Sequence, residues 1–212
     1  MTVEVKKSRS GDIVPVLNGV HLHSIYDPEK EACEFLDKHT EDIDQNDYFM
    51  VWGLGFGFHI YQLQQYLREK NKDINILVIE PSSELVREYF GSSELKHKIA
   101  AKIISKSDPI ALYNDEFIID FLSKTPLILS HAPSVQMHKE YFEKFQNYQA
   151  PVDIHTVQKN IKSRWIATEM GQLNPESNIE NYLKTKIENT NDELSKFDYF
   201  IGAIESIVES TK

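Results

Sequence analysis

Apolar and polar residues alternate along the first part of the chain, between about residues 2 and 24. This alternation is typical of strands that have one buried face. The turn sequences SGD at 10–12 and NG at 18–19 divide the segment, so we expect a small antiparallel meander. Pro15 has no amide hydrogen to give to a sheet, which predicts that its strand lies at an edge.

The spacing of apolar residues then changes to that of a helix. Asp27 is a good capping residue and Pro28 suits the first helical turn. Apolar side chains recur at helical spacing from Ala32 to Leu36. A helix therefore follows the meander, and together they form a first division over residues 1–46.

Strand-like runs alternate with helical segments over residues 47–150. We expect strands at 48–53, 74–81, 99–105 and 126–133, and helices at 58–69, 82–90, 108–124 and 135–148. Strands that alternate with helices at this spacing form right-handed βαβ units around a parallel sheet. The sequence therefore predicts an α/β, Rossmann-like core with helices flanking a parallel sheet.

The third division, residues 151–212, has only helical patterns, at about 152–170, 177–189 and 191–209. We expect a helical C-terminal tail. Such a tail can cover its own sheet, lead into another domain or form the interface of a homo-oligomer. The pattern leaves these alternatives open.

Charge and composition narrow the functional classes. The chain has 23 basic and 33 acidic residues, a net charge of −10, and no dense basic run. Binding to nucleic acid or to an anionic membrane is therefore not expected. No window of about 18 apolar residues is present, and the single cysteine, Cys33, excludes an internal disulfide. We predict a cytoplasmic protein.

A glycine-rich turn, sequence GLGFG at 53–57, directly follows the first strand of the predicted sheet. In doubly wound sheets, ligands bind at the carboxyl ends of the strands, where this turn lies. An acidic residue at the end of the second strand suits the two hydroxyls of a ribose, and polar residues also end the third strand. The candidate cofactor-binding residues are Gly53, Gly55, Gly57, Glu80, Ser107 and Asp108. Alternatively, the glycines only let a helix pack closely on the sheet and Glu80 caps the next helix.

This turn resembles the GxGxG motif of S-adenosylmethionine-dependent methyltransferases. The resemblance implies S-adenosylmethionine as cofactor, held by the glycine turn and Glu80. Those enzymes usually have an acidic residue two positions before the first glycine, where this chain has Val51.

Three stretches, in order, resemble the N-terminal part of the motility-associated factor (Maf) family of flagellin glycosyltransferases. They are HLHSIYDPEKEA at 21–32, VWGLGFGFHIYQL at 51–63 and ILVIEPSSELVREYF at 76–90. The matching residues are His23, Ser24, Tyr26, Asp27, Pro28, Glu31 and Ala32, then Gly53, Gly55, Gly57, Phe58 and His59, then Glu80 and Pro81. The resemblance covers about residues 20–165.

The Maf resemblance implies transfer of a nonulosonic acid from a CMP-linked donor to Ser or Thr of flagellin or another acceptor protein. In that family the transferase site belongs to a following domain with a Gly-Pro-Ser signature. The nearest string here is HAPS at 131–134. We therefore expect this chain to correspond to the N-terminal domain alone, either as a fragment of a longer protein with a downstream glycosyltransferase domain or as a stand-alone relative. We expect it to bind ligand or substrate and not to catalyse transfer alone.

Eight histidines raise the question of a metal site. His21 and His23 lie at i, i+2, but no acidic or cysteine residue has a convincing ligand spacing to them. His131, His138 and His155 are scattered. The sequence favours surface or core histidines, and we expect no metal.

Overall fold

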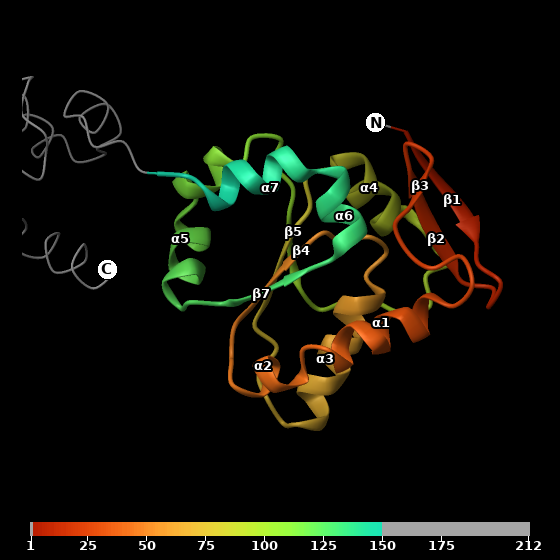
Figure 1. The fold of residues 1–212 in the computed structure, drawn as a ribbon, viewed down its shortest axis with the longest axis horizontal. Coiled ribbons are helices and arrows are strands. Elements are labelled where there is room, and N and C mark those ends of the chain that lie inside the picture. Colours follow the sequence, from red (N-terminus) through yellow and green to blue (C-terminus); the bar gives the residue numbers. More distant parts are fainter. Residues whose placement is uncertain (1, 150–212) are drawn as a thin grey trace, which may run out of the picture. The chain divides into compact units, whose positions relative to one another are not determined.

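The computed structural model describes residues 2–149 (Figure 1). The chain divides into two units after Tyr148, and the description below concerns the first. The predicted tail, 151–212, with its segments at 152–170, 177–189 and 191–209, lies outside the described residues.

The N-terminal segment forms the expected meander. Strands β1 (Val3–Lys7), β2 (Ile13–Leu17) and β3 (Val20–His21) pair antiparallel in the order β1-β2-β3. The edge position predicted for Pro15 is wrong, because β2 is the central strand. Pro15 is tolerated there because β3 is only two residues long and pairs with Val16 and Leu17. Pro15 needs no backbone N–H at this position, because its hydrogen bond on the β3 side is one that its carbonyl accepts, from the Leu22 N–H at 3.0 Å.

The central sheet is entirely parallel, which confirms the α/β, Rossmann-like prediction. Its strands are β4 (Phe49–Trp52), β5 (Ile76–Ile79), β6 (Lys102–Ile104) and β7 (Leu127–Ser130), in the order β6-β5-β4-β7. The chain runs outward from β4 to β5 and β6, then returns to place β7 on the other side of β4. The topological switch point therefore lies between the carboxyl ends of β4 and β7.

Helices cover both faces of this sheet (Figure 1). The elements are α1 (Pro28–Asp37), α2 (Thr40–Asp44), α3 (Phe58–Glu69), α4 (Ser83–Gly91), the 3₁₀ helix η1 (Ile110–Asn114), α5 (Glu116–Ser123), α6 (Ala132–Met137) and α7 (Lys139–Gln146). Helices α1 and α3 lie on one side of the sheet, and α7 lies on the other. No helix within residues 2–149 is long and apolar enough to cross a bilayer.

Several elements differ from the predictions. The helix expected over 135–148 is divided into α6 and α7, which meet at His138. The helix expected over 108–124 is divided, because the Asp115 side chain accepts from the Phe117 N–H and begins α5 there. The strand expected to reach residue 133 ends at Ser130, because Pro133 lies in the first turn of α6. The short α2 was not predicted.

Strand β4 is buried on both faces, as a central parallel strand should be. Phe49 and Val51 pack in one hydrophobic cluster that also contains Leu17 of the meander. Met50 and Trp52 belong to the cluster on the opposite face, where α7 covers them. The meander therefore shares a core with the sheet, which brings its following loop to the sheet's carboxyl edge.

Candidate functional site

The glycine turn has the backbone that its composition predicts. Gly53, Gly55 and Gly57 have φ values of 95°, 50° and 80°, in the left-handed region that favours glycine. The Gly57 N–H donates to the Leu54 carbonyl at 2.9 Å, and α3 begins at the next residue. The turn thus carries the chain from β4 into α3 within five residues.

The space around these glycines is filled by other residues of the chain. A β-carbon at Gly53 would lie 2.2 Å from Cβ of Ser134, and one at Gly55 would lie 2.2 Å from Nε2 of His23. At Gly57 it would lie 3.1 Å from Cγ2 of Ile99. These contacts support the close-packing interpretation of the turn. Binding of a ligand by the three glycines stays a prediction.

Glu80, predicted to bind a ribose, is fully buried behind the turn. Its Oε2 accepts from the Leu54 N–H at 2.8 Å, and its Oε1 accepts from the Ser82 N–H at 2.9 Å. Burial raises the pKa of Glu80 to about 7, although both backbone N–H groups oppose this. The carboxyl lies beside the glycine turn as expected, but both oxygens bond the protein's own backbone. Its role toward a ribose stays a prediction.

Of the other two predicted residues, Ser107 lines a separate groove along the same edge of the sheet, whereas Asp108 does not line it. Pro81, Ser107 and Pro109 form one wall, at the carboxyl ends of β5 and β6, and residues 136–141 and Lys144 form the other. The groove has a volume of about 560 Å³, within the usual range for small-molecule sites. Asp108 approaches it closely enough to help raise the pKa of the Tyr141 hydroxyl, of which burial is the larger cause.

Two side chains that line this groove carry buried polar atoms without a hydrogen-bond partner among residues 2–149. They are Nε2 of His138 and Oη of Tyr141. The His138 Nε2 lies 3.8 Å from Oε1 of Glu80, too far for a hydrogen bond. An unpaired buried polar group costs free energy, but both atoms are themselves buried, so a ligand in the groove could pair with them only after these side chains move.

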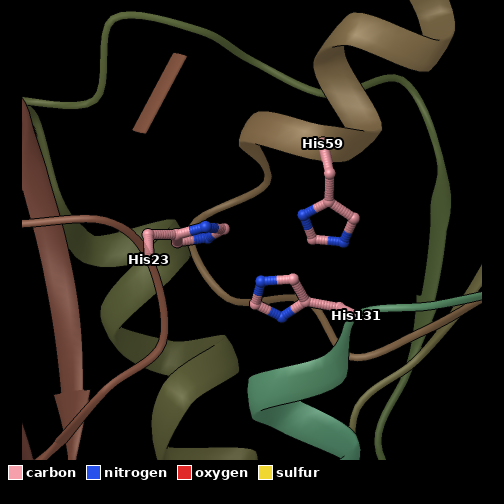
Figure 2. A group of neighbouring side chains, drawn as sticks. All are labelled: His23, His59 and His131. Carbon is pink, nitrogen blue, oxygen red and sulfur yellow. The ribbon is translucent and has the colours of Figure 1, made fainter. Parts of the chain in front are cut away.

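The switch point itself is occupied by three histidines, His23, His59 and His131 (Figure 2). His23 comes from the loop after β3, His59 from the first turn of α3, and His131 directly follows β7. The rings of His59 and His131 stack with centroids 4.3 Å apart, and His23 lies 4.7 Å from His131. All three are buried. Sequence reasoning did not bring these residues together, since they come from three distant segments.

Burial lowers the pKa of each of the three histidines, that of His59 to about 3. The rings are therefore neutral at pH 7, and each carries one N–H and one lone pair. Such a cluster can form hydrogen bonds in the core or bind a metal ion.

Comparison with known proteins gives little beyond the fold. No protein-family model matches the chain, and no curated protein is significantly similar to it. Among solved structures, the crystal structure of MnmC2 from Aquifex aeolicus is similar, with 12% sequence identity and a TM-score of 0.37. The match covers 54% of this chain and 46% of MnmC2, so the chain spans less than half of that protein's length. At this level of similarity the match says nothing about ligand or activity, and the parallel order β6-β5-β4-β7 itself defines the described domain as Rossmann-like.

Proposed function

We propose that residues 2–149 form a nucleotide-binding domain, with the nucleoside in the groove between Pro81 and Tyr141. The observation that carries the proposal is a ligand-sized groove with both apolar and polar lining residues, two of which, His138 and Tyr141, each have a buried polar atom without a hydrogen-bond partner among residues 2–149. This groove lies at the carboxyl ends of parallel strands, the usual position of ligands in such sheets.

The lining of the groove has the chemistry that a nucleotide needs. Pro81, Pro109 and Met137 provide apolar surface for a base, and the Ser107 hydroxyl can donate or accept. Lys139 and Lys144 supply positive charge for a phosphate. Glu140 also lines the groove, and Lys139 is paired with Glu143 at 3.5 Å, so the two lysines do not give the groove a clear excess of positive charge.

In its specific form, the proposal follows the Maf resemblance. The domain binds a CMP-linked sugar and presents it to a glycosyltransferase domain that modifies flagellin or another acceptor protein. It does not transfer the sugar alone.

A second candidate is a methyltransferase-like enzyme that binds S-adenosylmethionine. The position of Glu80 at the end of β5, beside the glycine turn, favours it. In this mode the ribose would replace the bonds that Leu54 and Ser82 make to Glu80, and the ligand would displace His23 or Ser134 from the turn. The third alternative, oligomerisation through residues 177–209, concerns residues outside the described part of the chain.

Isothermal titration of the full chain with CMP and with S-adenosylmethionine tests this proposal. We expect CMP to bind, and Lys144→Ala to weaken it several-fold while the matched change Lys30→Ala, on α1, does not. Binding of S-adenosylmethionine alone would favour the methyltransferase reading, and binding of neither would contradict nucleotide binding. Light scattering of the full chain and of one ending near Asn174 tests oligomerisation, since an unchanged association state would exclude the tail as its interface.

A further inference from the structure

The three histidines at the switch point offer one nitrogen each to a common centre. These nitrogens all lie within 4.8 Å of one another, and Figure 2 shows the rings grouped around a shared space. A tetrahedral zinc ion with Zn–N bonds of about 2.0–2.1 Å requires nitrogens about 3.4 Å apart. The planes of the His59 and His131 rings are only 5° apart, so one of these rings must also rotate for both in-plane lone pairs to reach the same ion.

Each ring has its other nitrogen next to an oxygen. Nδ1 of His23 lies 3.5 Å from Oε2 of Glu31. Nε2 of His59 lies 3.1 Å from the Gly53 carbonyl, and Nδ1 of His131 lies 2.8 Å from Oγ of Ser134. Metal-binding histidines are usually held in this way, with the outer N–H directed at a carboxylate, carbonyl or hydroxyl oxygen. The arrangement leaves Nε2 of His23, Nδ1 of His59 and Nε2 of His131 for the centre.

The inward nitrogen of His59 makes no hydrogen bond within the described part of the chain. Its Nδ1 is buried and has no hydrogen-bond partner among residues 2–149. The other two rings have competing contacts, since Nε2 of His23 accepts from the Phe56 N–H at 2.9 Å and His131 has a backbone hydrogen bond with Leu22. A metal ion would replace these two contacts and give His59 the partner that it lacks.

We propose that His23, His59 and His131 bind one transition-metal ion of the zinc class. Three neutral imidazoles are a donor set that suits Zn²⁺, Co²⁺, Ni²⁺ or Cu²⁺ and not Mg²⁺ or Ca²⁺. The ion would fasten the segment after the meander, through His23, to the start of α3, through His59, and to the carboxyl end of β7, through His131. This site shares no residue with the groove, so the proposal does not rest on nucleotide binding.

Titration of the chelator-treated full chain with Co²⁺ tests the proposal, with the visible absorption of Co²⁺ and the melting temperature as readouts. We expect one Co²⁺ per chain, the intense bands of a four-coordinate site, a rise in melting temperature, and displacement by Zn²⁺. His59→Gln should abolish the bands, while His97→Gln, at a partly exposed histidine, should keep them.

A milder variant keeps the test valid if His59→Gln does not fold. Glu31 is partly exposed, and Glu31→Gln retains an oxygen for its bond from the Ser24 N–H. We expect this change to weaken Co²⁺ binding about tenfold or more, whereas Glu34→Gln on the same helix leaves it unchanged. Absent bands and an unshifted melting temperature in the wild type would overturn the proposal. Equal binding by wild type, His59→Gln and Glu31→Gln would also overturn it.

Discussion

The side chain of Glu80 accepts a hydrogen bond from the backbone N–H of Leu54, with Oε2 2.8 Å from the nitrogen. This bond joins the end of β5 to the glycine turn, and the second oxygen binds the Ser82 N–H at the start of α4. One buried carboxyl thus fixes the geometry of two strand-to-helix connections. Its raised pKa shows that the protein holds it at a cost in free energy.

The pH dependence of stability should reveal this cost. The pKa of Glu80 rises from 4.5 to about 7 on folding, so between these values the folded state binds more protons than the unfolded state. The contribution of Glu80 to the free energy of unfolding therefore falls as pH rises from about 4.5 to 7, by at most about 1.4 kcal/mol per pH unit.

Urea unfolding of the wild type and of Glu80→Gln at pH 5, 6, 7 and 8 isolates this contribution. Glutamine does not titrate, so we expect the stability of the wild type relative to the variant to decrease from pH 5 to pH 7 and then level off. A relative stability that stays constant from pH 5 to pH 7 would show that the pKa of Glu80 is not raised on folding.

Gly55 should tolerate no side chain. Gly55→Ala places a methyl group against the His23 ring and also forces alanine to a φ of 50°. We expect a loss of about 2–5 kcal/mol in the free energy of unfolding. Gly11 has a φ of 92° but nothing within 4 Å of an added β-carbon, so Gly11→Ala should lose only the backbone part, about 1–2 kcal/mol. Equal losses in the two variants would mean that His23 does not pack against the turn.

Tyr141→Phe should change stability and ligand binding in opposite directions. Removing a buried hydroxyl without a partner among residues 2–149 should raise the melting temperature. Loss of one hydrogen bond to a bound nucleotide should weaken CMP binding by about 0.5–1.5 kcal/mol. Scanning calorimetry measures the melting temperature, and isothermal titration of the same preparation measures CMP binding. Tyr26→Phe, at an exposed tyrosine, is the control, and a fall in melting temperature for Tyr141→Phe would show that the hydroxyl is already paired.

The start of α4 depends on one hydroxyl. Oγ of Ser82 accepts from the Leu85 N–H at 3.1 Å, the bond of a helix N-cap. Ser82→Ala should lower the free energy of unfolding by about 0.5–2 kcal/mol, which urea unfolding measures. Ser83→Ala, one residue later on the exposed side, should cost much less, and the reverse order would place the cap at Ser83.

The sequence was most informative where local chemistry decides the structure. Asp27 caps the helix that it was expected to cap, and α3 has the predicted bounds. Periodicity also located all four strands of the parallel sheet. These features depend on residues within a few positions of each other, so one sequence is enough to find them.

Contacts between distant segments were not predictable in this way. Nothing in the spacing of His23, His59 and His131 shows that they meet, because their contact requires the meander to pack beside the sheet. The sequence shows that the glycines form a turn. It does not show that Ser134 and His23 fill the space beside them. The edge position predicted for Pro15 was wrong for the same reason. The short length of β3 means that no residue of that strand needs a backbone N–H from Pro15.

Amide NMR spectra of the isotope-labelled full chain during titration with CMP test the central claim most directly. If the nucleotide binds in the groove, shifts should concentrate on Ser107, His138, Lys139 and Tyr141 and leave Gly55 and Phe56 unchanged. Shifts centred on the glycine turn, with the groove unaffected, would contradict the account.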